Sequence, residues 1–305
     1  MKSRLQSKDI VWKITTLAAC LVLPVQAEEP RLSLGDLIQQ AAKYNPDIRA
    51  TERRWEAAKA RIPQAQTLPD PRINLGYKEL EMRETMYGFS QALPFPGKLR
   101  LRGEVAASEA DISEQDYLAT ALQVIAALKQ AYYDLHFIHE SESVLENTKR
   151  LLVQFEATAE VRYGVGQSAQ QDIFRAQAEI SRLLARLATL EQKKQSLHAE
   201  INRLLNLPPA DPLGTPAAIQ MTPLKHKLEE LNALLDQSAP LLLQRAKGVE
   251  RGGKAVELAQ RDYYPNFEVG ASGLREEPTG KNGYQVMLSV EVPLYFQTKR
   301  SEAHV

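Results

Sequence analysis

One segment without glycine or proline constrains this fold more than any other feature of the sequence. Residues 104–163 contain neither residue type, whereas an ordinary helix is about a dozen residues long. As one helix, with a rise of about 1.5 Å per residue, the segment would be roughly 90 Å long. A helix of that length predicts an elongated molecule.

The apolar residues of this segment have coiled-coil spacing. They advance in alternating steps of three and four and then in sevens, which places them along one seam of a helix. The seam residues are Leu118, Ala121, Ile125, Leu128, Tyr132, Leu135, Ile138, Leu145, Leu152 and Ala159.

A short break at Gly164, Val165 and Gly166 separates this seam from a second one. The second seam has Lys194 as its one charged residue, and its apolar members are Ile173, Ala176, Ile180, Leu183, Leu187, Leu190, Leu197, Ile201 and Leu204. Two long helices joined by so short a turn must be antiparallel neighbours. Residues 97–207 are therefore predicted to form a long helical hairpin with its tip at residues 162–168.

Composition supports long helices with narrow seams. Hydrophobic residues make up 44% of the 305-residue chain and aromatic residues only 7%. The 38 basic and 38 acidic residues balance, so bulk charge indicates no nucleic-acid partner.

The first 27 residues have the form of an export signal. Basic residues precede an apolar run that is too short to span a bilayer, and Val25-Gln26-Ala27 forms a reasonable cleavage site. Cys20, the only cysteine, lies in a sequence similar to a bacterial lipoprotein box. Cys20 is thus either a lipidation site or part of the removed signal, and no disulfide is possible.

Two pairs of segments alternate apolar and polar residues as strands do. Residues 72–96 and residues 265–293 are each predicted to form a β-hairpin with one apolar face. Each predicted strand has about the length that crosses a bilayer when tilted. Four strands cannot close a barrel, and open edges are not tolerated in lipid, so several chains would have to share one barrel.

The chain contains an internal duplication. A shift of 194 positions aligns Leu34 with Leu228, Pro46 with Pro240 and Gly76 with Gly270 without a gap. The first repeat begins with a helix in residues 28–71, which Pro46 is predicted to interrupt or kink. The second repeat begins with a helix in residues 228–264, after a proline-rich connector at residues 208–227. Residues 294–305 would be the truncated start of a second long helix, so about a hundred residues that the duplication predicts are missing.

This ordered set of features resembles the TolC family of outer-membrane efflux proteins, including its heavy-metal and RND-type members. The resemblance covers residues 32–298. It rests on the duplicated order of helix, strands and hairpin, on residues 93–99 (LPFPGKL) at the strand-to-helix junction, and on residues 162–168 (RYGVGQS) with Asp172 at the turn.

The resemblance implies a homotrimer in the outer membrane of a Gram-negative bacterium, with a shared transmembrane β-barrel in lipid and a periplasmic α-barrel. The connector would lie in the family's equatorial region. The hairpin tip would bind a periplasmic adaptor (membrane fusion) protein, and an inner-membrane pump would supply the energy. The adaptor contact is predicted at Tyr163, Gly164, Val165, Gly166, Gln167 and Ser168, although the glycines could serve only the turn.

Other candidate sites have simpler interpretations. His136 and His139 have metal-ligand spacing, but no third ligand is evident, so neither a metal site nor a cofactor is expected. No catalytic motif appears, so the chain is not expected to be an enzyme. Tyr77, Tyr87 and Tyr284 either pack ordinarily or form interfacial aromatic girdles. If they form girdles, the residues that face the barrel lumen would be Gly88, Ser90, Asn266, Glu268, Ser272 and Gln285.

The sequence therefore predicts a mainly α fold with β-structure, in which a long antiparallel coiled-coil hairpin accompanies strand hairpins of a trimeric barrel. The predicted function is a passive exit duct of a tripartite efflux system, with metal ions or drugs as possible substrates. Two alternatives are a periplasmic coiled-coil scaffold without a pore and a non-functional truncated fragment.

Overall fold

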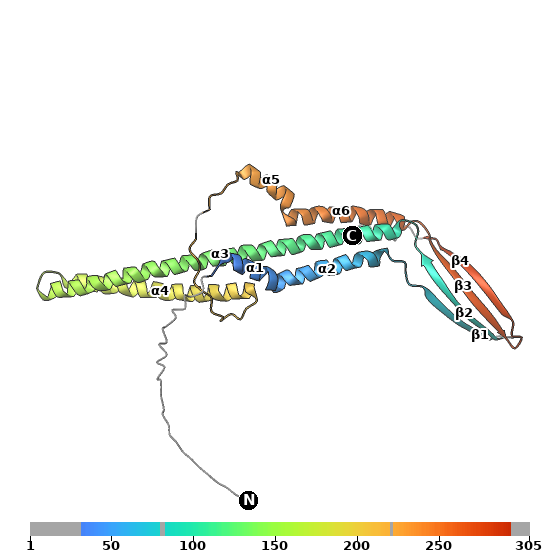
Figure 1. Ribbon diagram of the computed structural model, residues 1–305, viewed down its shortest axis with the longest axis horizontal. Coiled ribbons are helices and arrows are strands. Elements are labelled where there is room, and N and C mark those ends of the chain that lie inside the picture. Colours follow the sequence, from blue (N-terminus) through green and yellow to red (C-terminus); the bar gives the residue numbers. More distant parts are fainter. Residues whose placement is uncertain (1–31, 80–82, 220–221, 294–305) are drawn as a thin grey trace, which may run out of the picture.

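The computed structural model describes residues 32–79, 83–219 and 222–293. The predicted signal segment with Cys20 and the expected second long helix at residues 294–305 lie outside the described residues. The described part is elongated, with a helical hairpin at one end and a four-stranded sheet at the other (Figure 1). The prediction of a mainly α fold with strand hairpins is confirmed.

The helix α3 (Lys98–Gly164) is the axis of the molecule. It has 67 residues and is followed by the antiparallel α4 (Gln170–Leu205) of 36 residues. The predicted seams meet between them: Leu128, Leu135, Ile201 and Leu204 are fully or almost fully buried. The charged seam residue Lys194 is accommodated by an ion pair across the hairpin, with its Nζ 3.1 Å from Oε2 of Glu142.

The first repeat packs along α3 in line with α4. Its helical segment, expected in residues 28–71, is divided into α1 (Leu34–Tyr44) and α2 (Pro46–Gln66). The break falls at Asn45 because the residue before a proline is disfavoured in helical conformation. Figure 1 shows α2 and α4 lying beside successive parts of α3.

Asn45 makes this break a fixed joint. Its Oδ1 accepts hydrogen bonds from the backbone N–H groups of Asp47 (2.9 Å) and Ile48 (3.1 Å), and its Nδ2 donates to the carbonyl oxygen of Leu204 at 2.9 Å. The side chain therefore caps α2 and satisfies a carbonyl group at the end of α4.

The connector returns to this same level of the molecule. The backbone N–H of Leu32 donates to the carbonyl oxygen of Thr215 at 2.9 Å, and that of Ala217 donates to the carbonyl oxygen of Leu32 at 3.2 Å. The hydroxyl of Tyr132, on α3, donates to the carbonyl oxygen of Leu32 at 3.0 Å. The connector is thus anchored to the middle of the long helix.

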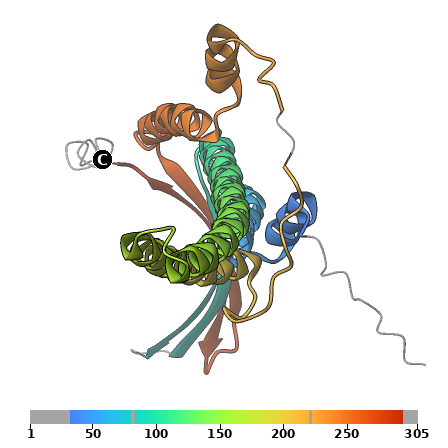
Figure 2. The same cartoon turned by 90° about the vertical axis from the view of Figure 1, so that its left-hand side faces the viewer.

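The second repeat is also divided, so the single helix expected in residues 228–264 requires correction. The structure has α5 (Leu228–Ser238) and α6 (Pro240–Arg261), with the break at Ala239 before Pro240 for the same steric reason as at Asn45. Helix α6 lies along α3, whereas α5 points away from it (Figures 1 and 2).

The two repeats join in one antiparallel sheet. The strands β1 (Arg72–Glu79), β2 (Arg83–Leu93), β3 (Asn266–Glu277) and β4 (Asn282–Glu291) lie in sequence order. The central pairing of β2 with β3 runs from Arg83 opposite Glu277 to Leu93 opposite Phe267. Among the described helices, none has the length and hydropathy needed to cross a membrane.

Candidate functional site: a two-faced sheet and a hairpin tip

One face of the sheet is apolar and uncovered. The pairing register places Leu75, Tyr87, Gly273 and Tyr284 side by side in one row, and the side chains of Leu75 and Tyr284 are 81% and 89% exposed. All three predicted girdle residues belong to this face, because Tyr77 lies two positions along β1 from Leu75. A contiguous exposed apolar surface of this kind marks contact with a partner or with lipid.

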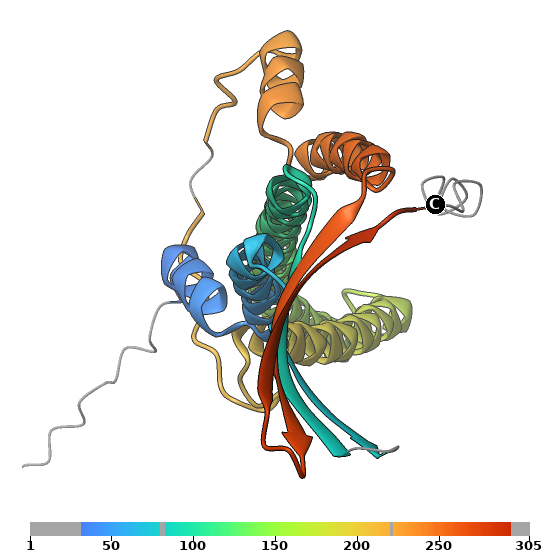
Figure 3. The same ribbon diagram turned by 90° about the vertical axis from the view of Figure 1, so that its right-hand side faces the viewer.

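The opposite face carries mostly small and polar residues, together with Met86, Leu274 and Met287. A neighbouring row contains Asn74, Gly88, Ser272 and Gln285. The lumen candidates all share this face: Gly88, Ser90, Asn266, Glu268, Ser272 and Gln285. The sheet is curved, as Figure 3 shows, and no described helix packs over either face at its centre.

Strand proximity requires a glycine on this polar face. A Cβ atom on Gly88 would lie 2.7 Å from the carbonyl oxygen of Ala271 and 2.7 Å from Cβ of Ser272. Since one of these neighbours is backbone, it cannot rotate away. The close approach of β2 and β3 at the join between the repeats therefore depends on Gly88.

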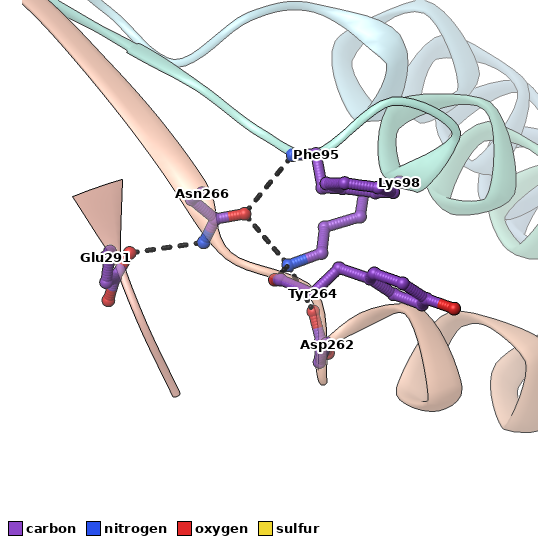
Figure 4. Close-up of polar contacts among 6 residues, drawn as sticks. All are labelled: Phe95, Lys98, Asp262, Tyr264, Asn266 and Glu291. Carbon is purple, nitrogen blue, oxygen red and sulfur yellow. Dashed lines mark hydrogen bonds and ion pairs between the residues drawn. The ribbon is translucent and has the colours of Figure 1, made fainter. Parts of the chain in front are cut away.

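A buried lysine joins the sheet to the helices (Figure 4). Lys98 begins α3 and its side chain is 2% exposed. Its Nζ donates to the carbonyl oxygen of Tyr264 at 3.0 Å and to Oδ1 of Asn266 at 2.8 Å, and lies 3.4 Å from Oδ1 of Asp262. Every partner belongs to the second repeat, so Lys98 connects the two repeats at the base of the sheet.

Neighbouring contacts extend this junction. The rings of Phe95 and Tyr264 stack with centroids 4.6 Å apart. Asn266 accepts a hydrogen bond from the backbone N–H of Phe95 at 3.3 Å and donates to Oε2 of Glu291 at 3.1 Å. Asn266 thus lies on the polar face as predicted, but its amide is engaged in the junction.

The hairpin tip is a compact turn between α3 and α4. The N–H of Gly166 donates to the carbonyl oxygen of Tyr163 at 2.9 Å, and the N–H of Gln167 donates to that of Arg162 at 2.8 Å. Gly166 has a φ of 74°, a left-handed conformation in which glycine is favoured. The hydroxyl of Ser168 donates to the carbonyl oxygen of Ala159 at 3.2 Å.

This turn presents apolar side chains outward. Val165 is 65% exposed, and Tyr163 is also exposed. The structure thus brings the six predicted tip residues together. The exposed Val161 and Phe174 flank the turn and were not among the predicted contact residues. Their positions off the heptad seams could have indicated them.

The two histidines with metal-ligand spacing, His136 and His139, both lie on α3. In the described part of the chain, no group of three or more His, Cys, Asp or Glu side chains is arranged to hold a metal ion. His139 instead lies near His198 of α4, with Glu142, Glu191 and Lys194 close by.

His198 is expected to make the hairpin sensitive to pH. Burial lowers its pKa below the ordinary value of 6.5, and nearby His139 and Lys194 act in the same direction, against Glu191 and Glu142. Because the folded state disfavours the charged ring, this contribution to stability is complete above pH 6.5 and is lost progressively as the pH falls from that value through the lower pKa of the folded protein.

We expect the urea midpoint of unfolding, followed by circular dichroism, to be lower at about pH 5.5 than at about pH 7.5, a range in which ordinary carboxyl groups stay charged. His198→Gln should reduce this difference, whereas His226→Gln, at an exposed position on the segment before α5, should leave it unchanged. An equal pH response in the wild type and His198→Gln would contradict this assignment.

Taken together, a sheet with one apolar and one polar face, a hydrogen-bonded junction and a projecting helical hairpin are the features of a channel protein of the outer-membrane type. The family model described as outer membrane efflux protein matches residues 37–207, more than half of the chain. The chain therefore belongs to the outer membrane efflux protein family, and the resemblance to TolC-type proteins is confirmed. It is accordingly not an enzyme.

Solved structures show the same fold at low sequence identity. The chain is similar to CusC with 16% identity and a TM-score of 0.75, covering 91% of this chain and 70% of CusC. VceC of Vibrio cholerae is 17% identical with a TM-score of 0.73, and the match covers 89% of this chain and 72% of VceC. The open state of MtrE of Neisseria gonorrhoeae is 19% identical with a TM-score of 0.69, and the match covers 91% of this chain and 67% of MtrE. No curated protein matches the chain.

Proposed function

We propose that this chain is the outer-membrane exit duct of a tripartite efflux system. The observation that carries the proposal is the sheet. Its exposed apolar face suits lipid, and its polar face suits a water-filled lumen. Its outer strands β1 and β4 each have an edge that no other described strand pairs. Open edges are not tolerated in lipid. Three copies would close a barrel of about twelve strands, within the range of outer-membrane barrels.

The helical hairpin has the complementary role in this proposal. It would extend into the periplasm and present residues 163–168 to the adaptor protein, while an inner-membrane pump supplies energy and direction. Metal ions and drugs both remain candidate substrates, because a passive duct needs only a passage for them.

Two adjacent residues of β4 test which face meets lipid. Val286 lies on the apolar face and is 72% exposed, and Gln285 lies on the polar face. An arginine facing the bilayer centre costs about 2–4 kcal/mol, whereas one in the lumen is tolerated. We expect Val286→Arg to reduce severalfold the amount of protein that requires detergent for extraction from outer membranes.

Gln285→Arg is the matched control and should assemble as the wild type does. Extraction of the wild type by carbonate alone would favour the periplasmic scaffold and refute the duct. Equal assembly of both variants would refute the assignment of the faces.

A further inference from the structure

Helix α6 contacts α3 through charged side chains. Nζ of Lys247 lies 3.1 Å from Oδ2 of Asp111, Nη1 of Arg251 lies 3.0 Å from Oε1 of Glu109, and Nζ of Lys254 lies 3.1 Å from Oε2 of Glu104. Residues 247, 251 and 254 are separated by steps of four and three, the spacing of a coiled-coil seam. Such a seam is ordinarily apolar, and polar seam residues fix register at a cost in stability.

Three regularly spaced apolar residues of α6 are exposed. Leu242, Val249 and Val256 recur every seven residues and are all exposed, Val249 at 78%. No residue of α6 is buried, although Leu243 and Leu258 are half-buried. Apolar burial therefore contributes less to the attachment of α6 than to that of α2, in which Ile48 is buried.

The first repeat uses the opposite arrangement. The shift of 194 positions relates Leu242, Val249 and Val256 to Ile48, Trp55 and Ile62 of α2. Those residues pack toward α3: Ile48 is buried and the ring of Trp55 stacks on Tyr117 with centroids 5.8 Å apart. The same helix in the two repeats thus packs on α3 by different faces, one apolar and one ionic.

The two contacts should respond differently to salt. The six charged side chains of the α6 contact remain 30–46% exposed, and exposed ion pairs contribute about 0–1 kcal/mol each. Screening shortens the range of their attraction to about 3 Å at 1 M salt. Apolar contacts are not weakened in this way, so α2 provides an internal reference.

We propose that α6 is a releasable helix, held against α3 by an ionic latch composed of the pairs Lys247–Asp111, Arg251–Glu109 and Lys254–Glu104. Beyond the latch, the C-terminal end of α6 is attached by the Lys98 junction after Asp262, and its N-terminal end leads through the break at Ala239 into α5. Release of the latch lets α6 move away from α3 while the sheet, α2 and α4 keep their places. The inference does not depend on the proposed duct function.

Spin-label distances in the full chain, purified in detergent, test the latch. In a Cys20→Ser background, one label at position 118 of α3 is paired with a label at position 245 of α6 or at position 57 of α2. We expect the 118–245 distance distribution to broaden and lengthen between about 50 mM and about 1 M NaCl, where screening becomes strong. The 118–57 distribution should stay unchanged.

Charge reversal provides the specific control. Glu109→Arg or Arg251→Glu alone should release α6 at low salt, and the two together should restore the wild-type distribution. Arg53→Glu, at an exposed arginine of α2, should change neither distance. The latch is refuted if the 118–245 distance is unaffected by salt and by both single reversals, or if both distances broaden together.

Discussion

Lys98→Met is expected to destabilise the protein by about 2–5 kcal/mol, because it leaves buried acceptor groups without their donor. Methionine keeps the length and apolar character of the side chain. It cannot donate to the carbonyl oxygen of Tyr264 or to Oδ1 of Asn266, both of which accept from Lys98 in the wild type. The measurement is a urea unfolding curve of the detergent-solubilised protein.

Arg100→Met is the matched control for this effect. Arg100 is exposed on the same turn of α3. Within the described residues, its one ion pair is with Glu104. Its replacement should change the free energy of unfolding by less than about 1 kcal/mol. A similar small effect of Lys98→Met would show that the junction does not hold the sheet to the helices.

Val165→Asp is expected to abolish efflux while leaving the channel assembled. The substitution puts a charge on the outermost apolar side chain of the turn, whose exposed surface we propose as the adaptor contact. The minimum inhibitory concentration of a transported compound should fall to that of a strain lacking the gene. The measurement combines this assay with quantification of the protein in the outer membrane.

Thr158→Asp carries the same charge change seven residues, or about two helical turns, before Val165 and should retain efflux. Equal loss in both variants would indicate that charge anywhere on the hairpin is harmful. Retained efflux in Val165→Asp would refute the role of Val165 in adaptor binding.

The regular elements were predictable because their signals are local. Heptad spacing at positions such as Leu128 and Ile201 identified the hairpin, and alternation at Ile73, Leu75 and Tyr77 identified a strand and its apolar face. The helix breaks were only partly predicted. Pro46 was recognised as an interruption, whereas its counterpart Pro240 was included in one helix of residues 228–264.

The junction and the latch were not predictable from local patterns. Lys98 and Asn266 are 168 positions apart, and in sequence Lys98 is one lysine within the LPFPGKL segment. Its burial results from the meeting of both repeats at one sheet. Likewise, the duplication relates Leu242 and Val249 to packed residues of α2, which would suggest that they face α3, whereas the structure turns the charged side of α6 toward that helix.

The state of this chain in the outer membrane tests the proposed duct most directly. Cells expressing it are fractionated, and the outer-membrane fraction is run on a denaturing gel with and without boiling. We expect a heat-sensitive trimer in that fraction, because only shared strands can close the edges of β1 and β4. Recovery of the chain only as soluble or aggregated monomer would contradict it.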